Sequence, residues 1–146
     1  MDKHSTKPIR VLILCTGNSA RSQMAEAVLR QMGGVKFEVF SAGVNPTLVR
    51  PQAMVVMREI GIDISKQYSK SVREFEGQEF DCVITVCDNA NEHCPVFLGN
   101  TQRIHWSLED PAAATGDAGA VLDVYRRVRD EILGKLHTFM LFDASS

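Results

Sequence analysis

Short apolar runs alternate with amphipathic segments along the chain. The β-branched apolar run at 9–14 ends at a cluster of Gly, Asn and Ser residues, which is typical of a buried parallel strand. Similar runs predict three more strands, at 37–42, 82–86 and 103–106. Apolar residues at helical spacing predict helices at 22–32, 51–60 and 121–139. The polar segment 65–78 is expected to form at most a short helix, and residues 1–8 are expected to fray.

Strands that alternate with helices indicate an α/β fold, here a four-stranded parallel sheet flanked by helices on both faces. No internal repeat or linker divides the sequence, so residues 1–146 are expected to form a single domain. Ligands of such sheets bind where loops leave the carboxyl ends of the strands. The loops after Leu14, Val86 and Trp106 are therefore the places where a functional site is expected.

Charge and cysteine content narrow the possible functions. Sixteen Lys and Arg residues against 18 Asp and Glu residues give a net charge of −2, without the basic excess of a nucleic-acid binder. The apolar run at 11–15 is too short for a signal peptide or a membrane span, so a soluble cytoplasmic protein without a membrane partner is expected. Four cysteines are too few for a disulfide scaffold, which leaves core filling, metal ligation or redox chemistry.

The loop after the first predicted strand combines a cysteine with small residues and an arginine. Its small residues let backbone N–H groups converge on an anion, and Gly17 and Asn18 can adopt the left-handed conformations that this requires. Arg21 can grip two oxygens of a tetrahedral anion. The same positive field stabilises a Cys15 thiolate, to which Ser22 can donate a hydrogen bond. The alternative is a buried structural cysteine, with Arg21 on a solvated helix face.

A second loop at the same end of the sheet contains Cys87 and Cys94. If the first and third strands are neighbours, their ends lie about 5 Å apart, which puts Cys87 within reach of Cys15. Seven residues of helix rise about 10.5 Å, whereas a disulfide needs Cα atoms within about 7 Å. A Cys87–Cys94 disulfide therefore requires the segment to unwind or loop out. Two buried free thiols, or a zinc site with His93 or Cys82, are the alternatives.

The loop after the fourth strand carries a carboxylate, because Asp110 comes directly before Pro111. A carboxylic acid held over an anion pocket can protonate a leaving oxygen, but Asp-Pro is also a common turn pair, and the residues alone favour neither. Cys82 lies inside a predicted strand and is interpreted as core filler. His105 and Trp106 close the fourth strand, where packing is expected rather than chemistry.

The sequence resembles the low-molecular-weight protein tyrosine phosphatases and the arsenate reductases built on the same fold. The pattern Cys-x5-Arg-Ser directly after the first strand is their signature, and the string CTGNSARSQMAEA closely resembles the arsenate-reductase form. The resemblance covers nearly the whole chain. Its further segments are Ser-Ala-Gly at 41–43, Gly-Ile-Asp-Ile-Ser at 61–65, residues 87–95, His-Trp at 105–106, Asp-Pro at 110–111 and residues 127–132.

This resemblance implies reduction of arsenate to arsenite, for arsenic detoxification. It implies that Cys15 attacks arsenate and that Asp110, rather than Glu109, protonates the departing oxygen. It also implies that Cys87 and Cys94 form a redox-active disulfide after Cys87 has first paired with Cys15. The residues implied in oxyanion binding are Thr16, Gly17, Asn18, Ser19, Ala20, Arg21 and Ser22.

The resemblance also implies the partners of the reaction. Arsenate is the expected substrate, and phosphate or sulfate competes with it. Thioredoxin is the expected reductant, with glutaredoxin or a small thiol as alternatives, and neither a cofactor nor a metal is expected. The other possible function is phosphomonoester hydrolysis through a Cys15 phosphoenzyme. Against it, the alanines at 112–114 replace the tyrosines that usually wall the phosphatase cleft.

One departure from the family pattern concerns a cation site. Some relatives bind potassium near the anion loop through an Asn, a Ser and a carboxylate. Asn18 and Ser41 match this set, but Lys70 stands at the carboxylate position. No potassium site is predicted, because an ammonium group there supplies a competing charge.

Overall fold

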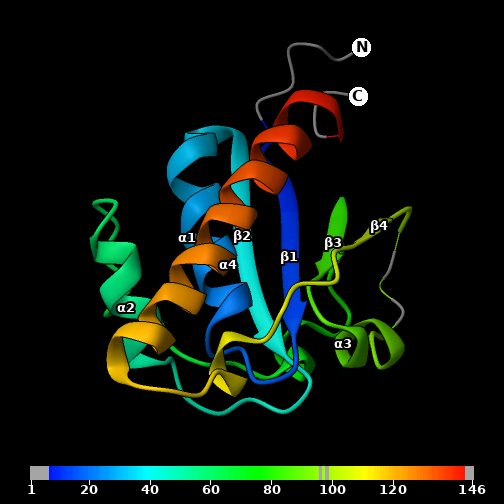
Figure 1. Cartoon of the computed structure of the whole chain (residues 1–146). Helices are drawn as coiled ribbons and strands as arrows, with labels where there is room; N and C mark the ends of the chain where they lie inside the picture. The colour runs from blue at the N-terminus through cyan, green and yellow to red at the C-terminus, as the bar shows by residue number, and fades with distance from the viewer. Residues whose placement is uncertain (1–6, 96, 98, 144–146) are drawn as a thin grey trace.

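Four parallel strands form the centre of the computed structural model, which describes residues 7–95, 97 and 99–143 (Figure 1). Their order across the sheet is β2-β1-β3-β4. The strands are β1 (Ile9–Cys15), β2 (Phe37–Gly43), β3 (Cys82–Thr85) and β4 (Gln102–His105). The predicted parallel sheet is confirmed, and the predicted ends of every strand lie within one residue of the observed ones.

Four α-helices connect and flank these strands. They are α1 (Arg21–Gly33), α2 (Pro51–Arg58), α3 (Asp88–Glu92) and α4 (Ala118–Thr138). Shorter helical turns are η1 (Gly34–Lys36), η2 (Val72–Phe75), η3 (Pro111–Ala113) and η4 (Phe139–Asp143).

Local chemistry explains where these helices differ from the prediction. Helix α4 begins three residues earlier than predicted, because the Asp117 side chain caps it by accepting a 2.8 Å hydrogen bond from the Ala120 N–H. Helix α2 ends two residues before Ile60. The polar segment 65–78 forms only the turn η2. Of the segment expected to fray, residues 1–6 lie outside the described part of the chain.

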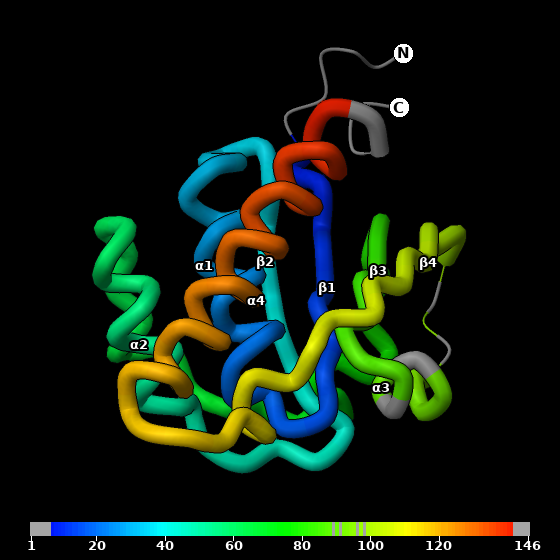
Figure 2. Tube along the Cα trace, in the orientation of Figure 1, coloured from blue at the N-terminus to red at the C-terminus, as the bar shows by residue number. Residues whose placement is uncertain are grey.

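Helices cover both faces of the sheet, as predicted (Figure 2). The steps from β1 to β2 and from β3 to β4 run in opposite directions across the sheet. Right-handed crossovers therefore place α1 and α3 on opposite faces. Helix α4 packs against α1 and α2.

Strand β1 is the most buried part of the core, because it runs between β2 and β3. Residues 11–15 are all at most 2% exposed. Burying an aliphatic side chain of this size stabilises the fold by roughly 1.5–3 kcal/mol. Cys82 lies opposite Val11 in the neighbouring strand and is 2% exposed, as expected for core filler. Trp106 is partly buried against the same core, which agrees with its predicted packing role.

The register brings the candidate loops to one edge of the sheet. Leu14 lies opposite Thr85, and Thr85 lies opposite His105, so β1, β3 and β4 end side by side. At the end of β2, Gly43 lies against the loop that follows β1. A Cβ atom on Gly43 would lie 2.5 Å from the carbonyl oxygen of Thr16 and would displace this loop.

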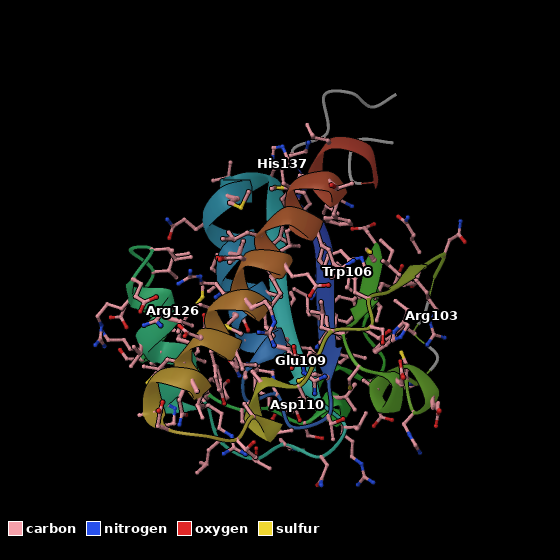
Figure 3. The ribbon with its side chains drawn as sticks, in the orientation of Figure 1. Arg103, Trp106, Glu109, Asp110, Arg126 and His137 are labelled. Atoms are coloured by element: carbon pink, nitrogen blue, oxygen red, sulfur yellow. The ribbon has the colours of Figure 1, made fainter. Side chains whose placement is uncertain are left out.

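Charged side chains join α4 to the end of α2. Arg129 donates to the carbonyl oxygen of Val56 at 2.9 Å and to Glu59 at 2.8 Å. Arg126 also bonds the Glu59 carboxylate and points toward α2 in Figure 3. The hydrogen bond from Arg126 is the main cause that lowers the pKa of Glu59 from 4.5 to about 2.

The lowered pKa of Glu59 predicts a pH-dependent contribution to stability. A carboxylate with a depressed pKa in the folded state stabilises that state above pH 4.5, and this contribution is lost as the pH falls toward 2. Over this window, the unfolding free energy should rise more steeply with pH in wild type than in Glu59→Gln. The difference in slope corresponds to the uptake of up to about one proton on unfolding. Urea unfolding at a series of pH values measures it. Glu131→Gln, an exposed change on α4, should retain the wild-type slope.

Candidate active site

The sulfur of Cys15 lies at the end of β1 between two hydrogen-bond donors. Cys15 is 2% exposed, and the backbone N–H of Asn18 donates to its Sγ at 3.1 Å. The Ser22 hydroxyl lies 2.9 Å from the same sulfur. Because Ser22 Oγ accepts a hydrogen bond from the Asn18 side-chain amide at 2.7 Å, its own hydrogen is free to point at the sulfur. Two donors aimed at one sulfur are the hydrogen bonds that a thiolate, the nucleophilic form of cysteine, accepts.

Asn18 holds the loop in the shape that creates this arrangement. It is fully buried and has a φ of 49°, the left-handed conformation expected for it, which Gly17 does not share. Its amide nitrogen also donates to Ser41 Oγ at 3.0 Å. Its side-chain oxygen accepts from Gln23 at 3.0 Å and from the backbone N–H of Lys70 at 2.9 Å.

A pocket of about 180 Å³ opens above the Cys15 sulfur. Its lining consists of Cys15, Thr16, Gly17, Ser19, Ala20, Arg21, Asn45, Thr47, Arg50, Asp110 and Ala112. The predicted oxyanion-binding residues thus line this pocket, except Asn18 and Ser22, which lie beneath the loop and bond to one another. Asn45, Thr47 and Arg50 come from the loop after β2, which the sequence analysis did not consider.

Arg21 and Asp110 meet at the pocket, as predicted. Arg21 begins α1, and its Nη1 donates to the carbonyl oxygen of Leu108 at 3.0 Å, which fixes the guanidinium. Its Nη2 lies 3.8 Å from Asp110 Oδ2. Asp110 also accepts a hydrogen bond from the Ala112 N–H at 3.0 Å, so it is a turn residue as well as a pocket residue.

Glu109, the neighbouring carboxylate, does not line the pocket. It pairs with Arg127 of α4 at 2.8 Å. Figure 3 shows Glu109 and Asp110 on the segment that passes the amino-terminal end of α4. The preference for Asp110 over Glu109 therefore agrees with the geometry.

Cys87 follows β3 and lies next to the anion loop. It is 8% exposed, and its Sγ lies 3.2 Å from the hydroxyl of Thr16, the residue after Cys15. The backbone N–H of Ala90 donates to the same sulfur at 3.4 Å. The predicted neighbourhood of the first and third strands is confirmed, and it places a second buried thiol against Thr16, the residue that follows Cys15.

Cys94 lies beyond α3 and is half-buried. None of the four cysteines, all of them among the described residues, is in a disulfide, and α3 is intact between Cys87 and Cys94. Burial raises the pKa of the Cys94 thiol, and the positive charge of Arg103 on β4 opposes this effect. The Cys94 thiol donates a long hydrogen bond, at 3.5 Å, to the carbonyl oxygen of Pro95.

Comparison with known proteins identifies the family. Residues 10–144 match the family described as low molecular weight phosphotyrosine protein phosphatase. The chain belongs to this family. The resemblance seen in the sequence is therefore confirmed over nearly the whole chain.

Relatives within the phosphatase family carry the name arsenate reductase. The chain is 44% identical over 129 residues to an arsenate reductase of Halalkalibacterium halodurans, covering 88% of this chain and 93% of the relative. A solved arsenate reductase in the phosphate binding state is 33% identical, with a TM-score of 0.72, covering 91% and 97% of the two chains. The thioredoxin-dependent arsenate reductase Cg_ArsC1' of Corynebacterium glutamicum is 26% identical with a TM-score of 0.66, covering 94% of this chain and 65% of that one.

Beneath the phosphatase-family loop lies a buried pair of opposite charges. The Lys70 ammonium lies 3.9 Å from Glu26, and only 11% of its side chain is exposed. Burial lowers the pKa of Lys70, while the Glu26 carboxylate opposes this. Ser41, which bonds Asn18, also donates to Glu26. The ammonium group therefore joins the network that holds Asn18.

Within residues 7–95, 97 and 99–143, no group of three His, Cys, Asp or Glu side chains is arranged to hold a metal. In the same part of the chain, no helix is both long and apolar enough to cross a membrane.

The packing role expected for His105 is wrong. His105 ends the edge strand β4, where 30% of its side chain is exposed, and its ring forms hydrogen bonds instead of filling the core. Its Nε2 lies 2.9 Å from Asp88 Oδ1, and its Nδ1 lies 2.7 Å from the hydroxyl of Thr85. No local pattern predicts this contact, because Asp88 is 17 positions away along the chain.

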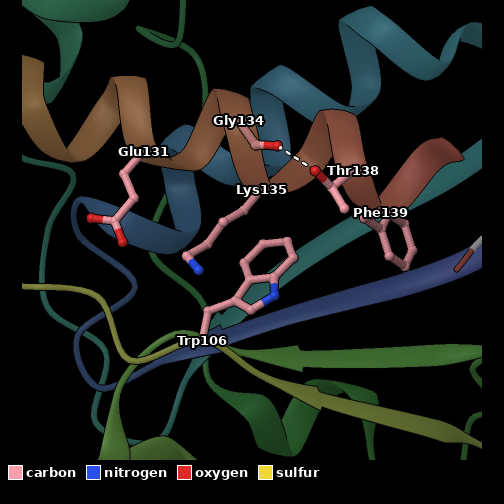
Figure 4. A pocket seen from close by; sticks show the side chains of 6 residues that line it. All are labelled: Trp106, Glu131, Gly134, Lys135, Thr138 and Phe139. Atoms are coloured by element: carbon pink, nitrogen blue, oxygen red, sulfur yellow. Dashed lines mark hydrogen bonds between the residues drawn. The ribbon is translucent and has the colours of Figure 1, made fainter. Parts of the chain in front are cut away.

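A second pocket, of about 410 Å³, lies between Trp106 and the last turns of α4 (Figure 4). The Lys135 ammonium lies 6.0 Å from the centre of the Trp106 ring, and Thr138 donates to the carbonyl oxygen of Gly134. No cysteine or arginine lines this pocket. Its chemistry therefore does not match that of the phosphatase-family loop.

The hydrogen bond from Ser22 predicts how fast Cys15 reacts. Ser22→Ala removes one of the two donors to the sulfur, so alkylation of Cys15 by iodoacetamide at neutral pH should slow by about tenfold, as for a lost hydrogen bond to a charged group. Peptide mass mapping follows Cys15 separately from the other thiols. Ser69→Ala is the matched control, because Ser69 bonds the carbonyl oxygen of Gly17 in the same loop without touching the sulfur. Equal slowing in both variants would contradict a direct role for Ser22.

Proposed function

We propose that the protein reduces arsenate to arsenite through a relay of Cys15, Cys87 and Cys94, as an arsenic detoxification enzyme. The observation that carries the proposal is the 3.2 Å contact between Cys87 Sγ and the Thr16 hydroxyl. A phosphatase needs one nucleophilic cysteine, and this contact places a second buried thiol beside the nucleophile's loop. The arsenate reductases among the relatives support the same function.

In the first step, the Cys15 thiolate attacks the arsenic atom of arsenate. The anion lies against the backbone N–H groups of the loop, and the Arg21 guanidinium grips its oxygens. A sulfur–arsenic bond forms and one oxygen leaves. Asp110 supplies the proton with which this oxygen departs as water. The pocket's small volume of about 180 Å³ suits a free tetrahedral oxyanion, so phosphate and sulfate compete with arsenate.

In the second step, the Cys87 thiolate attacks the Cys15 sulfur. A disulfide forms between the two cysteines while the sulfur–arsenic bond breaks. The electron pair of that bond remains on arsenic, which is thereby reduced from As(V) to As(III) and leaves as arsenite. The two thiols are oxidised, so atoms and electrons balance without a cofactor.

In the third step, Cys94 attacks Cys87 and releases the Cys15 thiolate. The remaining Cys87–Cys94 disulfide must reach an external dithiol, because thiol exchange requires access to the sulfur. Thioredoxin is the reductant we propose, supported by the thioredoxin-dependent relative. Glutaredoxin or a small thiol is the alternative. The relay needs reduced thiols, which suit a reducing compartment, so we propose that the protein acts in the cytoplasm. We also propose that residues 1–146 form a single domain.

Phosphomonoester hydrolysis is the second candidate function. Membership of the phosphatase family favours it, as do Cys15, Arg21 and Asp110 at one pocket. Ala112 lines that pocket, where an aromatic side chain would be needed to stack on an aryl phosphate. Hydrolysis also assigns no role to Cys87 or Cys94.

Replacing single cysteines tests the relay. Cys87→Ser should reduce thioredoxin-coupled arsenite production to background, because nothing then attacks the Cys15–arsenic adduct. Cys94→Ser should release about one arsenite per protein molecule and trap a Cys15–Cys87 disulfide, which mass spectrometry detects. Cys82→Ala is the control and should retain turnover, since Cys82 lies in the core of β3. Hydrolysis of an aryl phosphate without any arsenite production would favour the phosphatase instead.

Arg50 offers a second positive charge to the substrate. Arg50 is one of the residues that line the pocket, and its backbone N–H donates to the carbonyl oxygen of Ser19 at 2.9 Å, which ties its loop to the anion loop. Among the residues that the structure describes, no carboxylate forms an ion pair with Arg50. We propose that Arg50 attracts arsenate to the pocket entrance.

Arg50→Gln should raise the KM for arsenate about five- to tenfold with little change in kcat, because the lost attraction acts on binding. Steady-state kinetics at low and high ionic strength measure this, and salt should shrink the difference by screening the exposed charge. Arg58→Gln, at the far end of α2, should retain the wild-type KM. A fall in kcat at unchanged KM would assign Arg50 to a different step.

A further inference from the structure

Movement of Cys87 must displace Asp88, the first residue of α3. Cys87 is 8% exposed in the reduced protein, so a reductant cannot reach its sulfur without outward movement. Asp88 is bonded directly to Cys87 along the chain. Whatever holds Asp88 therefore opposes the exposure of Cys87.

His105 holds Asp88 from the neighbouring strand. A carboxylate only accepts hydrogen bonds. The 2.9 Å contact therefore requires that His105 Nε2 carries a hydrogen and donates a hydrogen bond to Asp88 Oδ1. On the other side of the ring, Nδ1 lies 2.7 Å from the Thr85 hydroxyl. Ser107 adds a longer hydrogen bond to the same Asp88 oxygen, at 3.4 Å.

The ring of His105 is in turn anchored to the sheet. His105 and Thr85 are register partners in β4 and β3, so their hydrogen bond joins the ends of two paired strands. Arg103 lies two residues earlier on β4, and alternate residues of a strand share a face. Its charge acts on Cys94, at the other end of the segment. Strand β4 thus meets both ends of the 87–94 segment, and Figure 3 shows Arg103 on the side where α3 lies.

We propose that His105 is a positioning residue for the disulfide-transfer step, because it holds Asp88 and the start of α3 in the reduced arrangement. This inference rests on the proposed function, since it assumes that Cys87 and Cys94 pair. The contact between His105 and Asp88 breaks when Cys87 moves to the surface. Its loss is part of the cost of forming the exposed disulfide.

The contact between His105 and Asp88 acts on the equilibrium between the Cys87–Cys94 dithiol and disulfide. An interaction present only in the reduced form favours the dithiol, and so makes the disulfide easier for the reductant to open. Without the His105–Asp88 contact, the equilibrium constant between the Cys87–Cys94 dithiol and disulfide should shift about three- to tenfold toward the disulfide. For a two-electron couple, a tenfold shift equals a reduction potential lower by about 30 mV.

The experiment measures the Cys87–Cys94 equilibrium in full-length protein that carries Cys15→Ser. The protein is equilibrated in buffers of reduced and oxidised glutathione, in which disulfide formation reduces one oxidised glutathione to two thiols. The disulfide is then quantified by acid quenching, alkylation and mass spectrometry. The variants are His105→Phe, His105→Gln, Asp88→Ala and the double variant His105→Phe/Asp88→Ala. His137→Gln, an exposed change on α4, is the matched control.

We expect His105→Phe and Asp88→Ala each to shift the equilibrium three- to tenfold toward the disulfide. The double variant should shift it no further than the larger single change, because both remove the same contact. His105→Gln should shift it less than His105→Phe, since the glutamine amide retains a donor for Asp88. Faster hydrogen exchange in reduced α3 of the shifted variants would support the same conclusion.

Other results would overturn the inference. Two results would show that His105 and Asp88 do not act as a pair. One is a dithiol–disulfide equilibrium constant within twofold of that of the Cys15→Ser parent protein, and the other is a double variant whose shift equals the sum of the two single shifts in free energy. If His105→Phe fails to fold, Asp88→Ala alone decides, because 75% of the Asp88 side chain is exposed and its loss leaves the core intact. If the parent protein forms no Cys87–Cys94 disulfide, the proposed relay itself is rejected.

Discussion

The buried amide of Asn18 is the interaction on which the site depends. Its side chain uses both amide hydrogens and its oxygen to join Ser22, Ser41, Gln23 and the backbone of Lys70, while its own N–H points at the Cys15 sulfur. A buried polar group is costly unless its hydrogen bonds are made, so the surrounding residues fix this amide in one orientation. The left-handed backbone at Asn18 is thereby held in place, and the loop presents its N–H groups to an anion.

The register of the parallel sheet adds the second thiol to this loop. Because β3 pairs with β1 and both strands end at the same edge, Cys87 emerges beside Thr16. On the proposed function, this second thiol is what adds redox chemistry to a loop of the phosphatase family. The position of Cys87 depends on this register, because β3 ends at Thr85, opposite Leu14, only two residues before Cys87.

The elements around the site differ in how firmly they are held. Strand β1 is buried on both faces, and α1 packs against β1, β2 and α4. Helix α3 has only five residues, with Ala90 buried in the core and a hydrogen bond to His105 at its start. A helix this short has little stability of its own, so α3 is better suited to movement than the anion loop.

The strands and the anion loop were predictable from the sequence because their signals are local. β-branched apolar runs between turn residues located each strand end within one residue, and Cys-x5-Arg-Ser located the loop around Cys15. The parts that only the tertiary structure decided depend on contacts between distant positions. Arg50 reaches the pocket from the loop after β2, and His105 faces Asp88 instead of the core because β4 is an edge strand. Strand register and the choice of face are set by packing across the whole sheet, which no local pattern of residues encodes.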